Sequence, residues 1–201
     1  MIAVRILVRA AAVLMALTST LAAAQSPTVD VDGVKFRQSI ELAGGNLVLN
    51  GVGIRTRLMF KVYAAGLYLP ERNADPTAIL RQSGAKRVAL RFLREVDADL
   101  FVASLLDGLR NNLSAQEVER LRPRTEVLVN TLRSIGSVRR GEWVDFEFTP
   151  RDGTRLILNG TTHGANIPGE DFFLAVLAVW LGDKPAHEDL KRGMLGTLQR
   201  G

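Results

Sequence analysis

The sequence predicts an α+β fold, in which helices cover one face of an antiparallel β-sheet. The order of elements is the first reason: several strands come first, then two or more helices, a β-hairpin and two further helices. The second is an apolar run at positions 60–69, rich in valine, tyrosine and leucine and closed by Pro70, which is typical of a strand buried on both faces. The third is a strand alternation at 142–149 that separates apolar from acidic residues.

The first 24 residues have the pattern of a secretory signal peptide. Two arginines precede an apolar segment, and the alanines at 22–24 provide a small-residue cleavage site. A membrane anchor is the alternative, but polar residues at 18–20 interrupt the run, which is shorter than the roughly 20 residues of a span. We therefore expect cleavage after Ala24, a periplasmic or secreted location, and a mature chain, 25–201, without an integral membrane span.

Composition argues against several classes of function. Removing the two arginines of the leader leaves 24 basic residues against 21 acidic ones, a net charge of +3 that is spread along the chain. No basic stripe interleaved with aromatic residues is present, so we expect no nucleic-acid partner. The chain has no cysteine, which removes disulfides, thiol catalysis and thiolate metal sites. With only His163 and His187 as histidines, we expect no metal and no cofactor.

The stretch at 47–70 is the one around which the chain is organised. Residues 34–42 predict a strand that leads into it through a hairpin turn at 43–46. An apolar run at 47–49 then precedes a predicted loop that contains Gly51, Gly53, Arg55 and Arg57. The glycines indicate a tight turn. Two arginines at the mouth of a buried strand favour either an anionic ligand or a carboxylate partner, because arginine keeps its charge in proteins.

Helix signals dominate the middle of the chain. The predicted elements are a short helix at 77–82, a strand at 87–93 and a helix at 98–113. Asp97 is a suitable N-cap for the last of these. Ser114 and Glu117 form a capping-box pattern for the next helix, which we expect Pro123 to kink or to split in two.

The remaining elements are a hairpin and two helices. The pattern predicts strands at 142–149 and 155–158, an irregular loop at 160–169, a buried helix at 171–181 and a last helix at 187–195. No nucleophile elbow or phosphate-binding loop accompanies them. Gly51 and Gly53 match half of a dinucleotide fingerprint, but Thr56 occupies the third glycine position and a strand follows instead of a helix.

Two segments resemble a known family. Residues 49–70, LNGVGIRTRLMFKVYAAGLYLP, resemble the opening strand unit of bacterial chalcone isomerase-like proteins. Residues 180–196, WLGDKPAHEDLKRGMLG, resemble the end of the same domain, and the likeness covers residues 34–198. It implies an open-faced β-sandwich, a large antiparallel sheet with helices packed on one face and a ligand cleft between the two layers.

The resemblance implies two different activities. Plant enzymes of this superfamily are intramolecular lyases that cyclise a chalcone to a flavanone. They use an arginine that Arg55 matches. A fixed cation in a dry pocket stabilises the negative charge that moves from phenolate to enolate as the ring closes. Their next position is a threonine, where this chain has Tyr63. Fatty-acid-binding relatives instead pair the arginine with a tyrosine to hold a carboxylate. Their tunnel is apolar, and in this chain Ala65 and Leu67 share the strand face of Tyr63. Tyrosine in place of the plant threonine therefore favours ligand binding over cyclisation.

The first hypothesis is therefore a periplasmic domain that binds a small apolar anion, a fatty acid or a phenolic compound, through Arg55, Tyr63, Ala65 and Leu67. The second is a true isomerase in which Arg55 and Tyr63 are catalytic, although the plant tyrosine and asparagine have no counterparts on the helix at 98–113. The third is a structural or partner-binding protein whose cleft is filled by its own side chains. Arg55 could simply pair with a carboxylate, and Tyr63 with the backbone; the oligomeric state stays open.

Overall fold

Seven strands form one antiparallel sheet in the computed structural model, which describes residues 27–198. Their spatial order is β11-β10-β9-β6-β5-β4-β3. The strands are β3 (Ser39–Leu42), β4 (Gly45–Arg57), β5 (Phe60–Leu69), β6 (Lys86–Phe92), β9 (Trp143–Thr149), β10 (Gly153–Leu158) and β11 (Thr161–Ile167). Two short ribbons accompany the sheet: β1 (Thr28–Val31) with β2 (Val34–Arg37), and β7 (Val96–Asp97) with β8 (Ser137–Val138).

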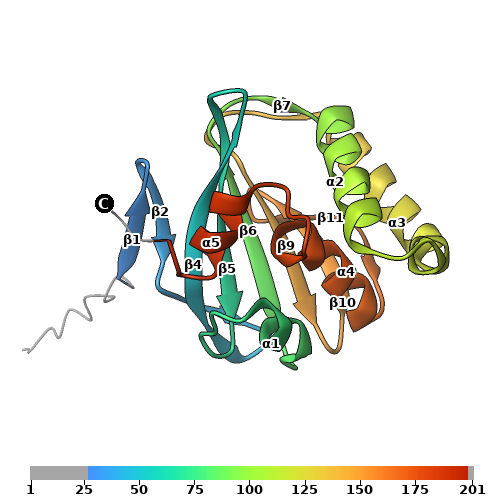
Figure 1. The fold of residues 1–201 in the computed structure, drawn as a ribbon, viewed down its shortest axis with the longest axis horizontal. Coiled ribbons are helices and arrows are strands. Elements are labelled where there is room, and N and C mark those ends of the chain that lie inside the picture. Colours follow the sequence, from blue (N-terminus) through green and yellow to red (C-terminus); the bar gives the residue numbers. More distant parts are fainter. Residues whose placement is uncertain (1–26, 199–201) are drawn as a thin grey trace, which may run out of the picture.

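Helices cover one face of this sheet, which confirms the predicted α+β architecture (Figure 1). They are α1 (Pro76–Arg81), α2 (Ala98–Asn112), α3 (Ala115–Ile135), α4 (Glu170–Leu181) and α5 (Glu188–Met194). The main core lies between the two layers, where alternate residues of β5, β6 and β9 meet the apolar sides of α2 and α4. Helix α4 is buried along almost its whole length, because it packs between the sheet and the other helices.

A second, smaller core lies on the opposite face of the sheet. The β1–β2 ribbon covers part of that face, with Phe36 packed against residues of β3, β4 and β5. Tyr68 belongs to this side and donates a hydrogen bond to the carbonyl of Arg37 at 2.9 Å. Strand β5 is therefore buried on both faces, which confirms the prediction from its continuous apolar run. The acidic residues of β9, Asp145 and Glu147, also face this side, where arginines pair with them.

The predicted helix starts agree with the structure. Asp97 caps α2 by accepting hydrogen bonds from the amides of Asp99 and Leu100. Ser114 and Glu117 form both bonds of a capping box at the start of α3. The predicted split at Pro123 is wrong: α3 continues through the proline without a break. Buried residues on both sides of Pro123 hold the helix against the core, and this outweighs the one backbone hydrogen bond that proline cannot donate.

Four loop and strand assignments are corrected. The strand predicted at 34–42 breaks at Gln38, so β2 and β3 belong to different sheets, and the predicted turn at 43–46 shortens to two residues. The loop predicted after position 49 is instead the second half of the 13-residue strand β4. The loop predicted at 160–169 contains β11, an edge strand whose mostly exposed side chains leave no apolar alternation to read.

The predicted signal peptide, residues 1–24, lies outside the described residues. Within 27–198, none of the helices is both long and apolar enough to cross a membrane.

Candidate functional site

Glycines on β4 lie just before Arg55, the candidate site arginine. Gly51 and Gly53 face the helices, and their backbone is in direct contact with α5: a Cβ at Gly53 would lie 2.4 Å from the carbonyl oxygen of Leu190. Gly193 of α5 makes the reciprocal approach to Gly53. The tight turn predicted from these glycines is therefore wrong, since they allow a helix to lie against a strand. Arg55 is the next residue on this side of β4, two positions beyond Gly53.

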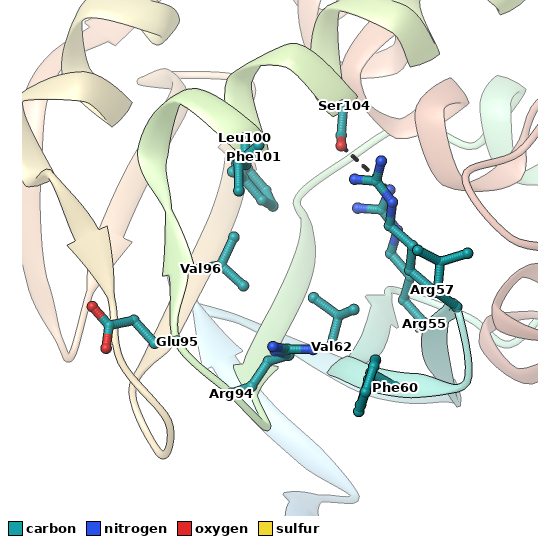
Figure 2. Close-up of a pocket in the computed structure, with 11 residues that line it drawn as sticks. Arg55, Arg57, Phe60, Val62, Arg94, Glu95, Val96, Leu100, Phe101 and Ser104 are labelled. Carbon is teal, nitrogen blue, oxygen red and sulfur yellow. Dashed lines mark hydrogen bonds between the residues drawn. The ribbon is translucent and has the colours of Figure 1, made fainter.

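Arg55 and Tyr63 are direct cross-strand partners on β4 and β5. The guanidinium carbon of Arg55 lies 5.7 Å from the centroid of the tyrosine ring, within the range of a cation–π interaction. Immediately beyond this pair, the register shifts, as at a β-bulge. The guanidinium also donates from Nη2 to Ser104 Oγ of α2 at 3.4 Å, so that the charge is held between the sheet and the helix layer (Figure 2).

Tyr63 is almost fully buried and belongs to an aromatic cluster with Phe92 and Phe101. Its hydroxyl accepts a hydrogen bond from Trp180 Nε1 of α4 at 3.0 Å, not from the backbone. Burial raises the pKa of the phenol above its ordinary value of 10.0, although Arg55 and the bond from Trp180 partly oppose that rise. Tyr63 therefore stays neutral near pH 7 and keeps a hydroxyl hydrogen that it can donate.

A pocket of about 240 Å³ opens beside Arg55, between the end of the β4–β5 hairpin and the start of α2. Its lining is Arg55, Arg57, Leu58, Phe60, Val62, Arg94, Glu95, Val96, Leu100, Phe101 and Ser104. Figure 2 shows Arg55 and Arg57 side by side and the carboxylate of Glu95 directed away from them. The pocket thus combines apolar walls with three permanent positive charges, a composition suited to an amphipathic anion.

A much smaller cavity, of about 10 Å³, lies deeper, next to Tyr63 and Trp180. This volume is close to the minimum that one water molecule requires. Arg55, Phe101 and Ser104 line both cavities and therefore form the wall between them. Ala65 and Leu67 share the strand face of Tyr63 as expected, but they are fully buried in the core and line neither cavity. The ligand contact predicted for these two residues stays a prediction.

The charge of Arg55 is not neutralised by a carboxylate of the described residues. The ion pairs found within 27–198 include neither Arg55 nor Arg57 nor Arg94. The structural alternative considered for Arg55, pairing with a carboxylate, is thus not observed in this part of the chain. The same residues contain no group of three histidine, aspartate or glutamate side chains placed to hold a metal ion.

Two residues of the site were missed in the sequence. The sequence analysis finds no counterparts of the plant tyrosine and asparagine on the helix at 98–113, whereas in the structure Ser104 of this helix contacts Arg55. Ser104 lies three positions after Phe101, so helical spacing puts both on the same side of α2. Trp180 begins the C-terminal motif at 180–196, but only the packing of α4 brings its indole to Tyr63.

The comparisons agree with this architecture. A search of curated proteins finds no match. The crystal structure of a fatty-acid binding protein from Arabidopsis thaliana is similar, with a TM-score of 0.66 and 15% sequence identity over 84% of this chain and 96% of that one. At that identity the likeness shows the fold. A family model described as chalcone isomerase-like matches residues 28–196, most of the chain, and the protein therefore belongs to the chalcone isomerase-like family.

Proposed function

We propose that the protein binds a small apolar anion, a fatty acid or a phenolic compound, with its charged group at Arg55 and its apolar part in the outer pocket. The observation that carries this proposal is the position of Arg55: a permanent charge, unpaired within 27–198, at the inner end of a pocket with apolar walls. The description of the Arabidopsis structure as a fatty-acid binding protein supports the same class of ligand.

The contacts of Arg55 leave room for an anion. Its guanidinium makes a long hydrogen bond, 3.4 Å, to Ser104. The planar guanidinium has five N–H donors, so most of them remain for a carboxylate or a phenolate. Arg57 and Arg94 add positive charge at the outer part of the pocket. A neutral ligand of the same shape would gain the apolar contacts but not this charge pairing.

Pocket size restricts the ligand. A volume of about 240 Å³ is somewhat below the roughly 300–1,000 Å³ of most small-molecule sites. The closed core beyond Tyr63 gives a long chain no room, since Ala65 and Leu67 are fully buried. The apolar part of the ligand therefore points outward, past Phe60 and Leu100. A short-chain fatty acid fits wholly inside, whereas a longer one projects at the mouth.

Tyr63 acts as the second donor in this proposal. The Tyr63 oxygen already accepts a hydrogen bond from Trp180 Nε1, so the hydroxyl hydrogen of Tyr63 is directed toward another acceptor. The cavity between Tyr63, Arg55 and Ser104 has space for about one water molecule, and these three side chains supply polar groups at its otherwise apolar wall. A bridging water would thus connect the phenol to the head group.

We also propose that the site works in the periplasm or outside the cell, as the N-terminal pattern predicts.

Calorimetric titration tests the proposal. The ligands are octanoate, dodecanoate and cinnamate, and the affinity of each is compared with that of the alcohol of the same skeleton. We expect each carboxylate to bind more tightly than its alcohol, and native mass spectrometry to detect a carboxylate that survives purification. Equal affinities for acid and alcohol, or no binding of either, would contradict it.

Isomerase activity is assayed separately, as loss of chalcone absorbance above the spontaneous rate. N-terminal sequencing of exported protein tests cleavage after Ala24.

A further inference from the structure

The four most exposed large apolar side chains of the described residues lie together. Met59 is 95% exposed, Leu58 83%, Phe60 61% and Leu100 60%, whereas the next most exposed large apolar residue reaches only 40%. Leu58, Phe60 and Leu100 line the mouth of the outer pocket, and Met59 lies between the first two in the chain. We call these four residues the apolar tip. Figure 1 shows the β4–β5 hairpin at the same end of the sheet as β7, which leads into α2.

The turn at the tip differs from three other two-residue hairpin turns within 27–198. Leu58 and Met59 both have positive φ, 48° and 68°, the conformation that suits Asn-Gly in a two-residue hairpin. The hairpins β1–β2, β3–β4 and β10–β11 have the same signs of φ at Asp32-Gly33, Ala43-Gly44 and Asn159-Gly160. Each of these three has glycine at the second position. Among these four turns, only the β4–β5 turn has two residues with large apolar side chains at positive φ, a conformation that such residues rarely adopt.

The surroundings of the tip are positively charged. Arg57 and Arg94 are exposed at its base, and the guanidinium of Arg94 lies 5.0 Å from the ring centroid of Phe60. Lys61 is also nearby but pairs with Asp32 at 2.5 Å. The carboxylate of Glu95 points away from the arginines (Figure 2). Apolar side chains beside two arginines that have no ion-pair partner within 27–198 match the boundary of an anionic bilayer, where the acyl region takes the apolar groups and the phosphates attract the cations.

We propose that the apolar tip docks on an anionic lipid surface and inserts Leu58, Met59 and Phe60 between the lipid head groups. Because the mouth of the outer pocket is at the tip, docking would place the pocket directly against the source of an amphipathic ligand. The docking does not depend on ligand binding, since Met59 lines neither the outer pocket nor the inner cavity. The two proposals can therefore fail separately.

Sedimentation with vesicles tests the docking, with phosphatidylcholine alone or mixed with phosphatidylglycerol. We expect the wild-type chain to bind the mixed vesicles more strongly, and added salt to weaken binding. Met59→Gly gives the turn the same residue as the other three hairpins, so we expect it to fold at least as well. It should nevertheless bind the mixed vesicles about tenfold more weakly or worse, because one apolar side chain no longer inserts. Val127→Gln, at an exposed apolar position of α3, should bind like wild type.

A reporter at the tip gives a second measurement. Phe60→Trp adds an indole at the mouth, and we expect its emission to shift to shorter wavelength with mixed vesicles, while wild-type emission changes little. No vesicle binding by wild type, or equal binding by Met59→Gly, would overturn the proposal. Concentration-dependent self-association that Met59→Gly abolishes, without vesicle binding, would assign the tip to a second copy of the chain and also overturn it.

Discussion

Arg55 and Tyr63 lie directly opposite each other on adjacent strands, with the guanidinium carbon 5.7 Å from the centroid of the phenol ring. Each is also tied to a different helix: Arg55 contacts Ser104 of α2, and Tyr63 accepts a hydrogen bond from Trp180 of α4. The pair thus connects the sheet to two helices at the point where the core ends and the outer pocket begins. This placement leads to predictions on stability, on titration and on binding.

Tyr63→Phe should destabilise the fold by about 1–3 kcal/mol, because it leaves the buried indole N–H of Trp180 without an acceptor. Urea unfolding followed by circular dichroism measures the change. Tyr68→Phe is the matched control, since its hydroxyl bonds to a partly exposed carbonyl that water can reach, and it should cost less. If Tyr63→Phe and Trp180→Phe simply add in the double variant, the hydrogen bond does not couple the two residues.

High pH should unfold the protein as its tyrosines ionise. Burial raises the pKa of Tyr63 above 10.0 and that of Tyr68 to about 12, mainly because the charged phenolate is costly in the core. The folded state therefore holds its phenol protons longer than the unfolded state, and this stabilisation, complete below pH 10, is lost as pH rises toward 12.

These are the only two tyrosines of the chain, so tyrosinate absorbance reports on them alone. We expect that signal to appear together with the loss of circular dichroism. Tyrosinate that forms near pH 10 while the protein stays folded would show that the phenols are not shielded.

Gly53→Ala should destabilise the fold by about 1–3 kcal/mol or more, because the new methyl group would meet the backbone of α5 and push the helix away. Gly45→Ala provides the control on the same strand, where the nearest atom to a Cβ is 3.6 Å away. Urea midpoints of the two variants give the comparison. Equal midpoints would mean that α5 moves aside without cost and that Gly53 does not fix its position.

Local signals were enough to predict most elements of the fold. Asp97 and the Ser114–Glu117 pair indicate two helix starts through bonds within one turn, and the apolar run of β5 reflects burial on both faces. The second half of β4 could not be predicted in this way. Its glycines break the strand pattern. They are required because α5, more than 130 residues later, lies so close that a side chain at these positions would meet its backbone.

The candidate site was predictable in part. Arg55 and Tyr63 came from a family resemblance, and the structure brings them together. Ala65 and Leu67 followed from strand alternation, which gives the face of a residue but not whether a helix fills the space above it. Trp180 and Ser104 reach the site only through helix packing, which neither periodicity nor capping encodes. The apolar tip likewise follows from a turn that the sequence alone did not locate.

The direct test of the binding proposal is a comparison of octanoate with octanol in wild type and Arg55→Met, by calorimetric titration. Arg55→Met keeps much of the side-chain volume, and Arg151→Met, at a 93% exposed side chain, is the control for the same loss of charge. We predict that Arg55→Met weakens octanoate binding by about 2–4 kcal/mol and leaves octanol within about 0.5 kcal/mol of wild type. If acid and alcohol lose affinity equally, or octanoate binds as before, Arg55 does not hold the anion.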